Sequence, residues 1–231
     1  MDIQILEEKY HSIENSDSFS LHNEFIKELT REDSQKMLEF HLKLIDDCRG
    51  NRDLHRRICH AFEKRERDIA VQFLSEKLES SLSEALKADI IQILGILKSK
   101  EVLKLLPSLM KDKSELIRYK AIIVSGWIGD KANLSLLNEC LQRDSNEVLR
   151  GYAATAMRQI WLAQKAVPED ILPYLYTAIK KEDSEETLAM IIIVIQDLLK
   201  RKFGLQECIH DGAIKGDVLK AKERIIKKLE L

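Results

Sequence analysis

The residues best suited to metal chemistry lie in one short stretch of the chain. His55 and Cys59 are four positions apart, so a helix would place both side chains on one face, with Cys48 and His60 close in sequence. Imidazole nitrogen and thiolate sulfur are ligands that zinc prefers. However, residues 49–67 hold 7 basic and 3 acidic residues, and positive charge repels a cation. We therefore interpret these residues as a half-buried Cys among surface His side chains, and expect no metal and no cofactor.

Spacing alone shows no other catalytic pattern. No Ser or Cys nucleophile stands at a recognisable spacing from a His and an acid. The sequence "GAIKGD" lacks the Gly-Lys-Ser/Thr ending of a phosphate-binding loop. The basic stretch contains a single aromatic residue, Phe62, and therefore offers no platform on which bases could stack. We expect the protein not to be an enzyme and not to bind nucleic acid.

The composition predicts that helices position these residues. Only 8 Gly and 3 Pro are present, too few for the turns of a many-stranded sheet, and 45% hydrophobic with 33% charged residues is typical of soluble proteins. The amino terminus is acidic and lacks the apolar segment of a signal peptide. The longest apolar run, "LAMIIIVIQDLL", contains Gln196 and Asp197 and is too short to span a bilayer. The four Cys residues are widely separated, which indicates reduced thiols, so we expect a cytoplasmic protein without a membrane segment.

An apolar stripe recurs along the chain at offsets of 32, 31 and 32 residues. Its four positions follow the spacing i, i+4, i+7, i+11, which is one face of a helix. The positions are Leu54, Ile58, Ala61 and Arg65; Leu86, Ile90, Ile93 and Leu97; Ile117, Ala121, Val124 and Ile128; and Leu149, Ala153, Ala156 and Ile160. Further apolar helices lie between these stripes. Each unit is thus a helical hairpin that can bury its faces only against neighbouring hairpins.

Two of the turns carry the same polar signature, an Asp with an Arg six residues later: Asp112 with Arg118, and Asp144 with Arg150. This pattern resembles HEAT repeats, and "IRYKAIIVSGWIGDKANLSLL" is similar to the compact HEAT-like repeats of bilin-lyase relatives. The resemblance implies an all-α fold: a right-handed α-solenoid of stacked antiparallel helical hairpins, with helical caps at both ends. It also implies a structural ladder in which these Arg and Asp side chains hydrogen-bond across successive turns.

The ladder should be broken at two places. Lys87 stands where the first Arg would be, and Asp183 is followed six residues later by Ala189.

We expect a single solenoid domain over residues 1–231. It would comprise acidic capping helices over 1–48, HEAT-like repeats over 49–204 and a capping helix in 205–231. The expected core of the second capping helix consists of Phe19, Leu21, Phe25, Ile26 and Leu29.

Some proteins built from these repeats are enzymes. HEAT-like deoxyhypusine hydroxylases bind iron through His-Glu dipeptides, and none of the 6 His residues of this chain is followed by Glu. HEAT-like alkylpurine DNA glycosylases use Trp, Asp and Arg in a basic cleft. Trp127, Trp161, Asp130 and Arg158 are of the right types, but no local motif places them, and a net charge of −2 does not favour binding to a duplex. The glycosylase is kept as an alternative.

Recognition of another protein fits the sequence better. The second helices of HEAT hairpins line the concave surface, where partners usually bind in this family. Aromatic and Arg side chains are the types that anchor protein interfaces. We predict that the partner-binding residues on these helices are Tyr119, Trp127, Tyr152, Arg158 and Trp161, with Glu185 beyond them.

Small HEAT-like solenoids include bacterial immunity proteins, which bind a toxin domain, often a basic nuclease, and cover its active site. Residues 1–48 hold 12 acids against 5 bases, and Glu28, Glu32 and Asp33 would face the cationic cleft of such a nuclease. The most specific hypothesis is therefore an immunity protein, a monomer in complex with a basic toxin or nuclease domain. A generic HEAT-repeat scaffold or adaptor is the alternative.

Overall fold

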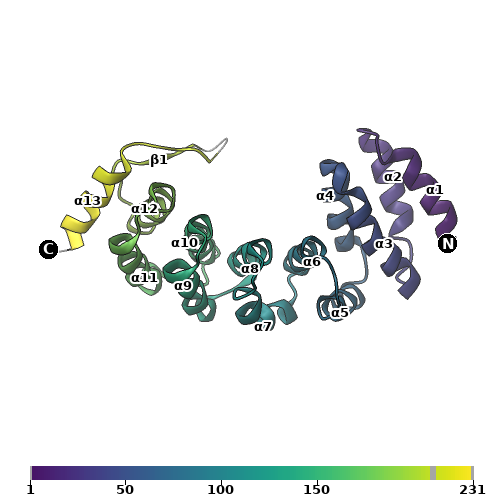
Figure 1. The fold of residues 1–231 in the computed structure, drawn as a ribbon, viewed down its shortest axis with the longest axis horizontal. Coiled ribbons are helices and arrows are strands. Elements are labelled where there is room, and N and C mark those ends of the chain that lie inside the picture. Colours follow the sequence, from purple (N-terminus) through teal and green to yellow (C-terminus); the bar gives the residue numbers. More distant parts are fainter. Residues whose placement is uncertain (1, 209–211, 230–231) are drawn as a thin grey trace. The chain divides into compact units, whose positions relative to one another are not determined.

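The computed structural model describes residues 2–208 and 212–229, most of which are helical (Figure 1). The α-helices are α1 Ile3–Ile13, α2 Phe19–Leu29, α3 Gln35–Asp47, α4 Arg52–Ala61, α5 Arg67–Leu78, α6 Glu84–Ile96, α7 Lys100–Leu109, α8 Glu115–Ile128, α9 Leu134–Arg143, α10 Glu147–Leu162, α11 Pro168–Lys181, α12 Glu185–Leu199 and α13 Val218–Leu229. Short 3-10 helices are η1 Cys48–Gly50, η2 Phe62–Lys64 and η3 Lys131–Asn133. Strands β1 Gln206–Glu207 and β2 Ile214–Lys215 pair antiparallel.

Consecutive helices pack against each other, which confirms the all-α solenoid of helical hairpins. By its internal contacts the chain divides into two compact units, Met1–Lys104 and Leu105–Leu231. The expectation of a single domain over residues 1–231 stays a prediction. Each helix within the described ranges is too short or too polar to traverse a lipid bilayer.

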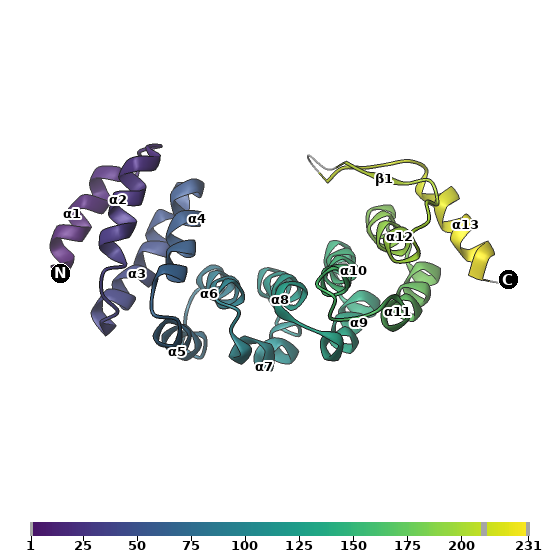
Figure 2. The ribbon, with the colours of Figure 1, turned by 180° about the vertical axis from the view of Figure 1, so that it is seen from behind.

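The first unit is built around α4 and α6. Helix α4 packs against α2, α3 and α6, while α5 packs against α6 and α1 against α2. In the second unit, α10 packs against α8, α9 and α12, and α11 packs against α9 and α12. Figures 1 and 2 show α8, α10 and α12 in one row of this unit, with α9 and α11 in a second row. The hairpin of β1 and β2 lies on the side of the first row.

Several helices begin at side chains that cap the free N–H groups of the first turn. The Asn51 side chain accepts a hydrogen bond from Leu54 N at 3.0 Å, and the Asn146 side chain accepts one from Val148 N at 2.9 Å. Asn and Ser are favoured at this position because their side-chain oxygen replaces the missing backbone acceptor. These residues therefore fix where α4 and α10 start.

The predicted apolar stripes form the core between hairpins. Nearly all of their residues are buried, among them Ile58, Ile90, Ala121 and Ala153, which are all 0% exposed. Ile128 at the end of its stripe is half-buried. Burial of a Leu, Ile or Val side chain contributes roughly 1.5–3 kcal/mol and that of an Ala less, so the stripes supply much of the stability of each stack.

A ladder of charged hydrogen bonds joins the turns of the second unit. Arg118 donates from Nε and Nη2 to the carboxylate of Asp144 at 2.8 and 3.0 Å. Its Nη1 donates to the backbone oxygen of Asp112 at 2.9 Å. The Asp112 carboxylate accepts from Ser114 N at 2.8 Å. Each Arg thus holds its own turn through a carbonyl and the following turn through a carboxylate.

The ladder continues into the next turn, where a break was predicted at Asp183, through the neighbouring acid Glu182. Arg150 donates from Nε and Nη2 to Glu182 at 2.7 and 2.8 Å, and from Nη1 to the backbone oxygen of Asp144 at 2.9 Å. Glu182 ends α11 as Asp144 ends α9, two residues before the N-cap of the next helix, so the ladder continues at the same position of the turn. Beyond this turn, Lys222 of α13 donates to the backbone oxygen of Glu182 at 2.8 Å. A cation of the capping helix thus replaces the missing Arg.

The first unit buries a cation at the polar position of its stripe. Arg65 donates from Nε to Nδ1 of His41 at 2.8 Å and from Nη1 to Asp33 at 2.8 Å. It also donates to the backbone oxygens of Glu32 at 2.9 Å and Leu29 at 3.1 Å. A buried charge is tolerated when its donors are matched in this way. The end of α2 and the turn that follows it supply three of these four acceptors.

His41 is fully buried and uncharged in this arrangement. Its ring stacks on Phe62 with centroids 4.0 Å apart, and its Nε2 lies 2.9 Å from the backbone oxygen of Ile58. Because Nδ1 accepts from Arg65, the proton lies on Nε2 and is donated to Ile58. Burial, followed by the neighbouring charge of Arg65, lowers the pKa of His41 to about 3.

The expected core of α2 is wrong at two positions. Phe19 and Leu21 are 62% and 44% exposed, whereas the remaining predicted core residues of α2 are buried. The centroid of the Phe19 ring lies 4.4 Å from the guanidinium of Arg57, a cation–π contact at the surface. At the other end, the paired strands β1 and β2 precede the capping helix α13. The buried side chain of Gln196 fixes the base of this β-hairpin by accepting from Phe203 N at 2.6 Å and donating to the backbone oxygen of Leu205 at 3.1 Å.

Candidate functional site

The β-hairpin encloses a groove of about 640 Å³ against α10 and α12 of the second unit. We call it the hairpin groove. Its apolar lining includes Val148, Tyr152, Met190, Ile193, Ile214 and Val218. The volume is within the range of ligand-binding clefts. The site therefore combines a helical floor with a wall that the repeats themselves do not provide.

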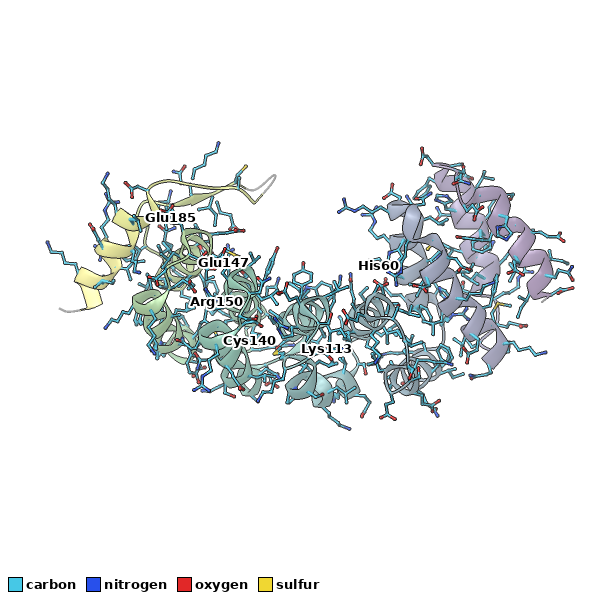
Figure 3. All side chains as sticks on the ribbon, viewed as in Figure 1. His60, Lys113, Cys140, Glu147, Arg150 and Glu185 are labelled. Carbon is cyan, nitrogen blue, oxygen red and sulfur yellow. The ribbon has the colours of Figure 1, made fainter. Side chains whose placement is uncertain are left out.

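Acidic residues dominate the charge of the hairpin groove. Glu185 and Glu186, in the first turn of α12, and Glu207 of β1 line it, against one cation, Arg158. Glu185 and the start of α10 at Glu147 are labelled in Figure 3. Arg158 pairs with Asp197 at 2.5 Å and with Glu207 at 2.9 Å. Because Arg158 is engaged by these two acids, the exposed Glu185 and Glu186 determine the sign of the groove.

A second groove of about 680 Å³ lies on the other side of Glu207 and carries the opposite charge. We call it the basic groove. Its lining includes Lys200, Arg201 and Lys202 after the end of α12, together with Trp161 and Leu162 of α10. Leu162 is 60% exposed, which is unusual for a large apolar side chain. The acidic residues of the hairpin groove thus lie at the start of α12, and the basic residues of the second groove follow its end.

The five predicted aromatic and Arg residues all lie on α8 and α10. Tyr152 and Arg158 line the hairpin groove, and Trp161 lines the basic groove with Arg158. Tyr119 meets Tyr152 edge to face with ring centroids 5.0 Å apart. Trp127 is 41% exposed on α8. Their role in binding a partner stays a prediction. Sequence reasoning missed the contribution of the hairpin, whose signal was three closely spaced glycines at 204, 212 and 216.

The predicted acids of the first unit are engaged in contacts within the chain. Glu28 accepts from Lys9 at 2.6 and 2.7 Å, and Glu32 accepts from the Ser34 hydroxyl at 3.1 Å. Asp33 binds the buried Arg65 at 2.8 Å. Asp33 therefore stabilises the fold, and a partner would have to compete for Glu28.

Asp130, considered together with the two Trp residues for a glycosylase, caps a short helix. Its side chain accepts from Ala132 N at 2.8 Å and caps η3. Arg158 is held by the ion pairs of the hairpin. The structure therefore gives each of these two polar residues a structural contact.

The stretch around His55 brings together only two of the four residues considered as metal ligands. His60 pairs with Glu63 at 3.0 Å, and the Cys48 thiol donates to the backbone oxygen of Ile45 at 3.7 Å. His55 and Cys59 lie together and are joined by a residue that sequence reasoning missed, Asp89 of α6. The signal was an acid inside the apolar run "ADIIQI".

Comparisons with known proteins agree with the repeat architecture. A family model of HEAT repeats matches residues 71–158. The chain is 27% identical over 114 residues to deoxyhypusine hydroxylase of Debaryomyces hansenii, a match that covers 48% of this chain and 36% of that protein. It is 30% identical over 114 residues to deoxyhypusine hydroxylase of Candida glabrata, covering 48% and 35%. The match thus spans about a third of the length of these relatives.

These relatives contradict the expectation that the chain is not an enzyme, because both carry the name of one. Because the match covers about a third of their length, it does not establish their activity for this chain. The iron ligands that the resemblance implies are His-Glu pairs, and none of the 6 His residues here is followed by Glu. The side chains present do not fit that iron site.

Proposed function

Because residues 71–158 are HEAT repeats within an α-solenoid, we propose that this protein is a HEAT-repeat scaffold that binds a segment of another protein in the hairpin groove. The observation that carries the proposal is the groove itself, with an apolar floor, a hairpin wall and an acidic edge. Repeat proteins commonly bind partners along such a row of helices.

The charges of the groove indicate the chemistry of the partner. Apolar side chains would enter between Tyr152 and Met190, and Lys or Arg side chains would meet Glu185 and Glu186. The basic groove would accept acidic residues of the same segment near Lys202. Helix α12 has 15 residues and is therefore about 22 Å long, which corresponds to about seven residues of extended chain.

Selection from a library of displayed random peptides tests this proposal. We expect the selected peptides to be enriched in Lys or Arg beside apolar residues, and their affinity to fall with salt. The double variant Glu185→Lys/Glu186→Lys should bind them at least tenfold more weakly. The control Asp53→Lys/Glu63→Lys makes the same charge change in the first unit and should bind like the wild type. Peptides that bind both variants equally well would refute the groove as the site.

A basic toxin or nuclease domain is a second candidate partner, and the acids of the groove are what favours it. Such a domain would present cations to Glu185, Glu186 and Glu207. The relatives found give this identity no support. Its test is inhibition: a purified basic nuclease domain should lose activity when titrated with the wild type, and keep it with the Glu185→Lys/Glu186→Lys variant. Equal activity in both titrations would remove immunity as a function.

A further inference from the structure

The first unit contains a partly buried group of three potential metal ligands. His55 and Cys59 project from one face of α4, and Asp89 comes from α6, which packs against it. Nε2 of His55 lies 3.2 Å from Oδ2 of Asp89, and Sγ of Cys59 lies 3.9 Å from Nε2 of His55. Cys59 and Asp89 are buried, at 7% and 8% exposure, while His55 is half-buried. One nitrogen, one sulfur and one oxygen ligand therefore converge from two helices.

Two of the three separations between these atoms are close to the edges of a tetrahedral zinc site, and the third, from Sγ of Cys59 to the Asp89 carboxylate, is within 4.8 Å. Zinc binds His nitrogen and carboxylate oxygen at about 2.0–2.1 Å and thiolate sulfur at about 2.3 Å. At tetrahedral angles, these bond lengths place N and O about 3.3 Å apart and N and S about 3.6 Å apart. The observed separations of 3.2 and 3.9 Å need only a few tenths of an ångström of adjustment.

We propose that His55, Cys59 and Asp89 bind a divalent transition metal ion, with zinc as the best match. Three protein ligands leave a fourth position for water or an exogenous ligand, as in zinc sites that act on substrates. The ion would join α4 to α6, two helices from different hairpins. Asp89, which lies outside the basic stretch in sequence, brings a negative charge to the site.

Arg49 is the competitor for this site. Its Nη2 lies 2.8 Å from Oδ2 of Asp89, the same oxygen that faces His55. Its Nε lies 2.7 Å from Asp46, which can hold the guanidinium when the ion takes Asp89. Metal binding would therefore break the contact of Arg49 with Asp89 and leave its contact with Asp46 in place. Replacing Arg49 by Gln should tighten metal binding.

Titration of untagged, chelator-treated protein with CoCl₂ and then ZnCl₂ tests the proposal. Bound Co²⁺ should show the sulfur-to-cobalt charge-transfer band of a thiolate ligand and the visible bands of tetrahedral geometry, with one ion per chain. Zinc should displace it, because zinc prefers tetrahedral sites with sulfur and nitrogen ligands. Zinc should also raise the unfolding temperature, since an ion that binds only the folded chain stabilises it.

Matched variants identify the ligands. Cys59→Ser should abolish the charge-transfer band, and His55→Gln should weaken cobalt binding about tenfold or more while retaining that band. His60→Gln, a control on the same helix, should behave like the wild type, and Arg49→Gln should bind more tightly. Far-UV circular dichroism confirms that each variant is folded. The proposal is overturned if the wild type binds no Co²⁺, or if the Cys59→Ser variant keeps the sulfur band.

Discussion

The buried His41 predicts a specific loss of stability in mild acid. Its pKa is about 3 in the folded chain and near its ordinary value of 6.5 in the unfolded chain. Between these values the unfolded chain binds more protons, so stability falls as the pH is lowered. The linkage relation gives a loss of about 2 kcal/mol between pH 7.5 and pH 5, and more below that.

The variant His41→Gln isolates this contribution. Gln keeps an amide N–H for the backbone oxygen of Ile58 and an oxygen that can accept from Arg65, but it does not titrate. Urea unfolding at pH 7.5 and pH 5.0, followed by far-UV circular dichroism, measures the free energy of unfolding of both proteins. The emission of Trp127 and Trp161, which both lie in the second unit, separates the transition of that unit.

We expect the wild type to lose about 2 kcal/mol more than His41→Gln over this pH interval, because other acid-titrating groups contribute equally to both. The variant should be less stable than the wild type at pH 7.5, where the imidazole is neutral and well packed. Equal losses in the two proteins would refute the reasoning, since they would mean that His41 takes up its proton without leaving the fold.

Three further predictions concern the stack and the hairpin. Asp144→Ala leaves Arg118 without its carboxylate and should lower the free energy of unfolding in urea by about 3–5 kcal/mol. The double variant Arg118→Met/Asp144→Leu should restore most of that free energy, and no recovery would contradict a local ion-pair effect. Gly126→Ala should lower the free energy of unfolding by about 1–3 kcal/mol, because the new Cβ would lie 3.0 Å from the α10 backbone. The control Gly50→Ala meets nothing within 4 Å and should change that free energy by less than about 0.5 kcal/mol. Equal losses in the two variants would count against close packing at Gly126. Arg158→Gln should speed hydrogen exchange in residues 206–208 and 212–215 by releasing the hairpin; unchanged exchange would show that Gln196 alone holds it.

The sequence predicts those parts of the fold that depend on local periodicity. The stripes at 86–97 and 117–128 place apolar side chains on one face of each helix, and the structure buries nearly all of them. The Asp and Arg six residues apart likewise lie within one turn and one helix. Such signals survive because each is set by neighbours in sequence.

Contacts between distant residues were harder to predict. Asp89 joins His55 and Cys59 only because α4 and α6 pack, and nothing near Asp89 in sequence marks that meeting. Glu182 pairs with Arg150 at a turn where the sequence predicted a break, because it ends α11 as Asp144 ends α9, and the spacing from Asp183 to Ala189 does not reveal where the helix ends. The β-hairpin has strands of two residues, too short for any alternation, and its base depends on Gln196 of the helix before it.

The arrangement of the rungs bears on how such a chain can change its number of repeats in evolution. Each rung links an Arg of one hairpin to an acid of the next, so a duplicated hairpin brings both halves of its joints with it. Insertion or deletion of a whole unit would then require no newly invented interface. The series ends where Lys222 takes over the backbone oxygen of Glu182, which marks the boundary between copied units and the terminal cap.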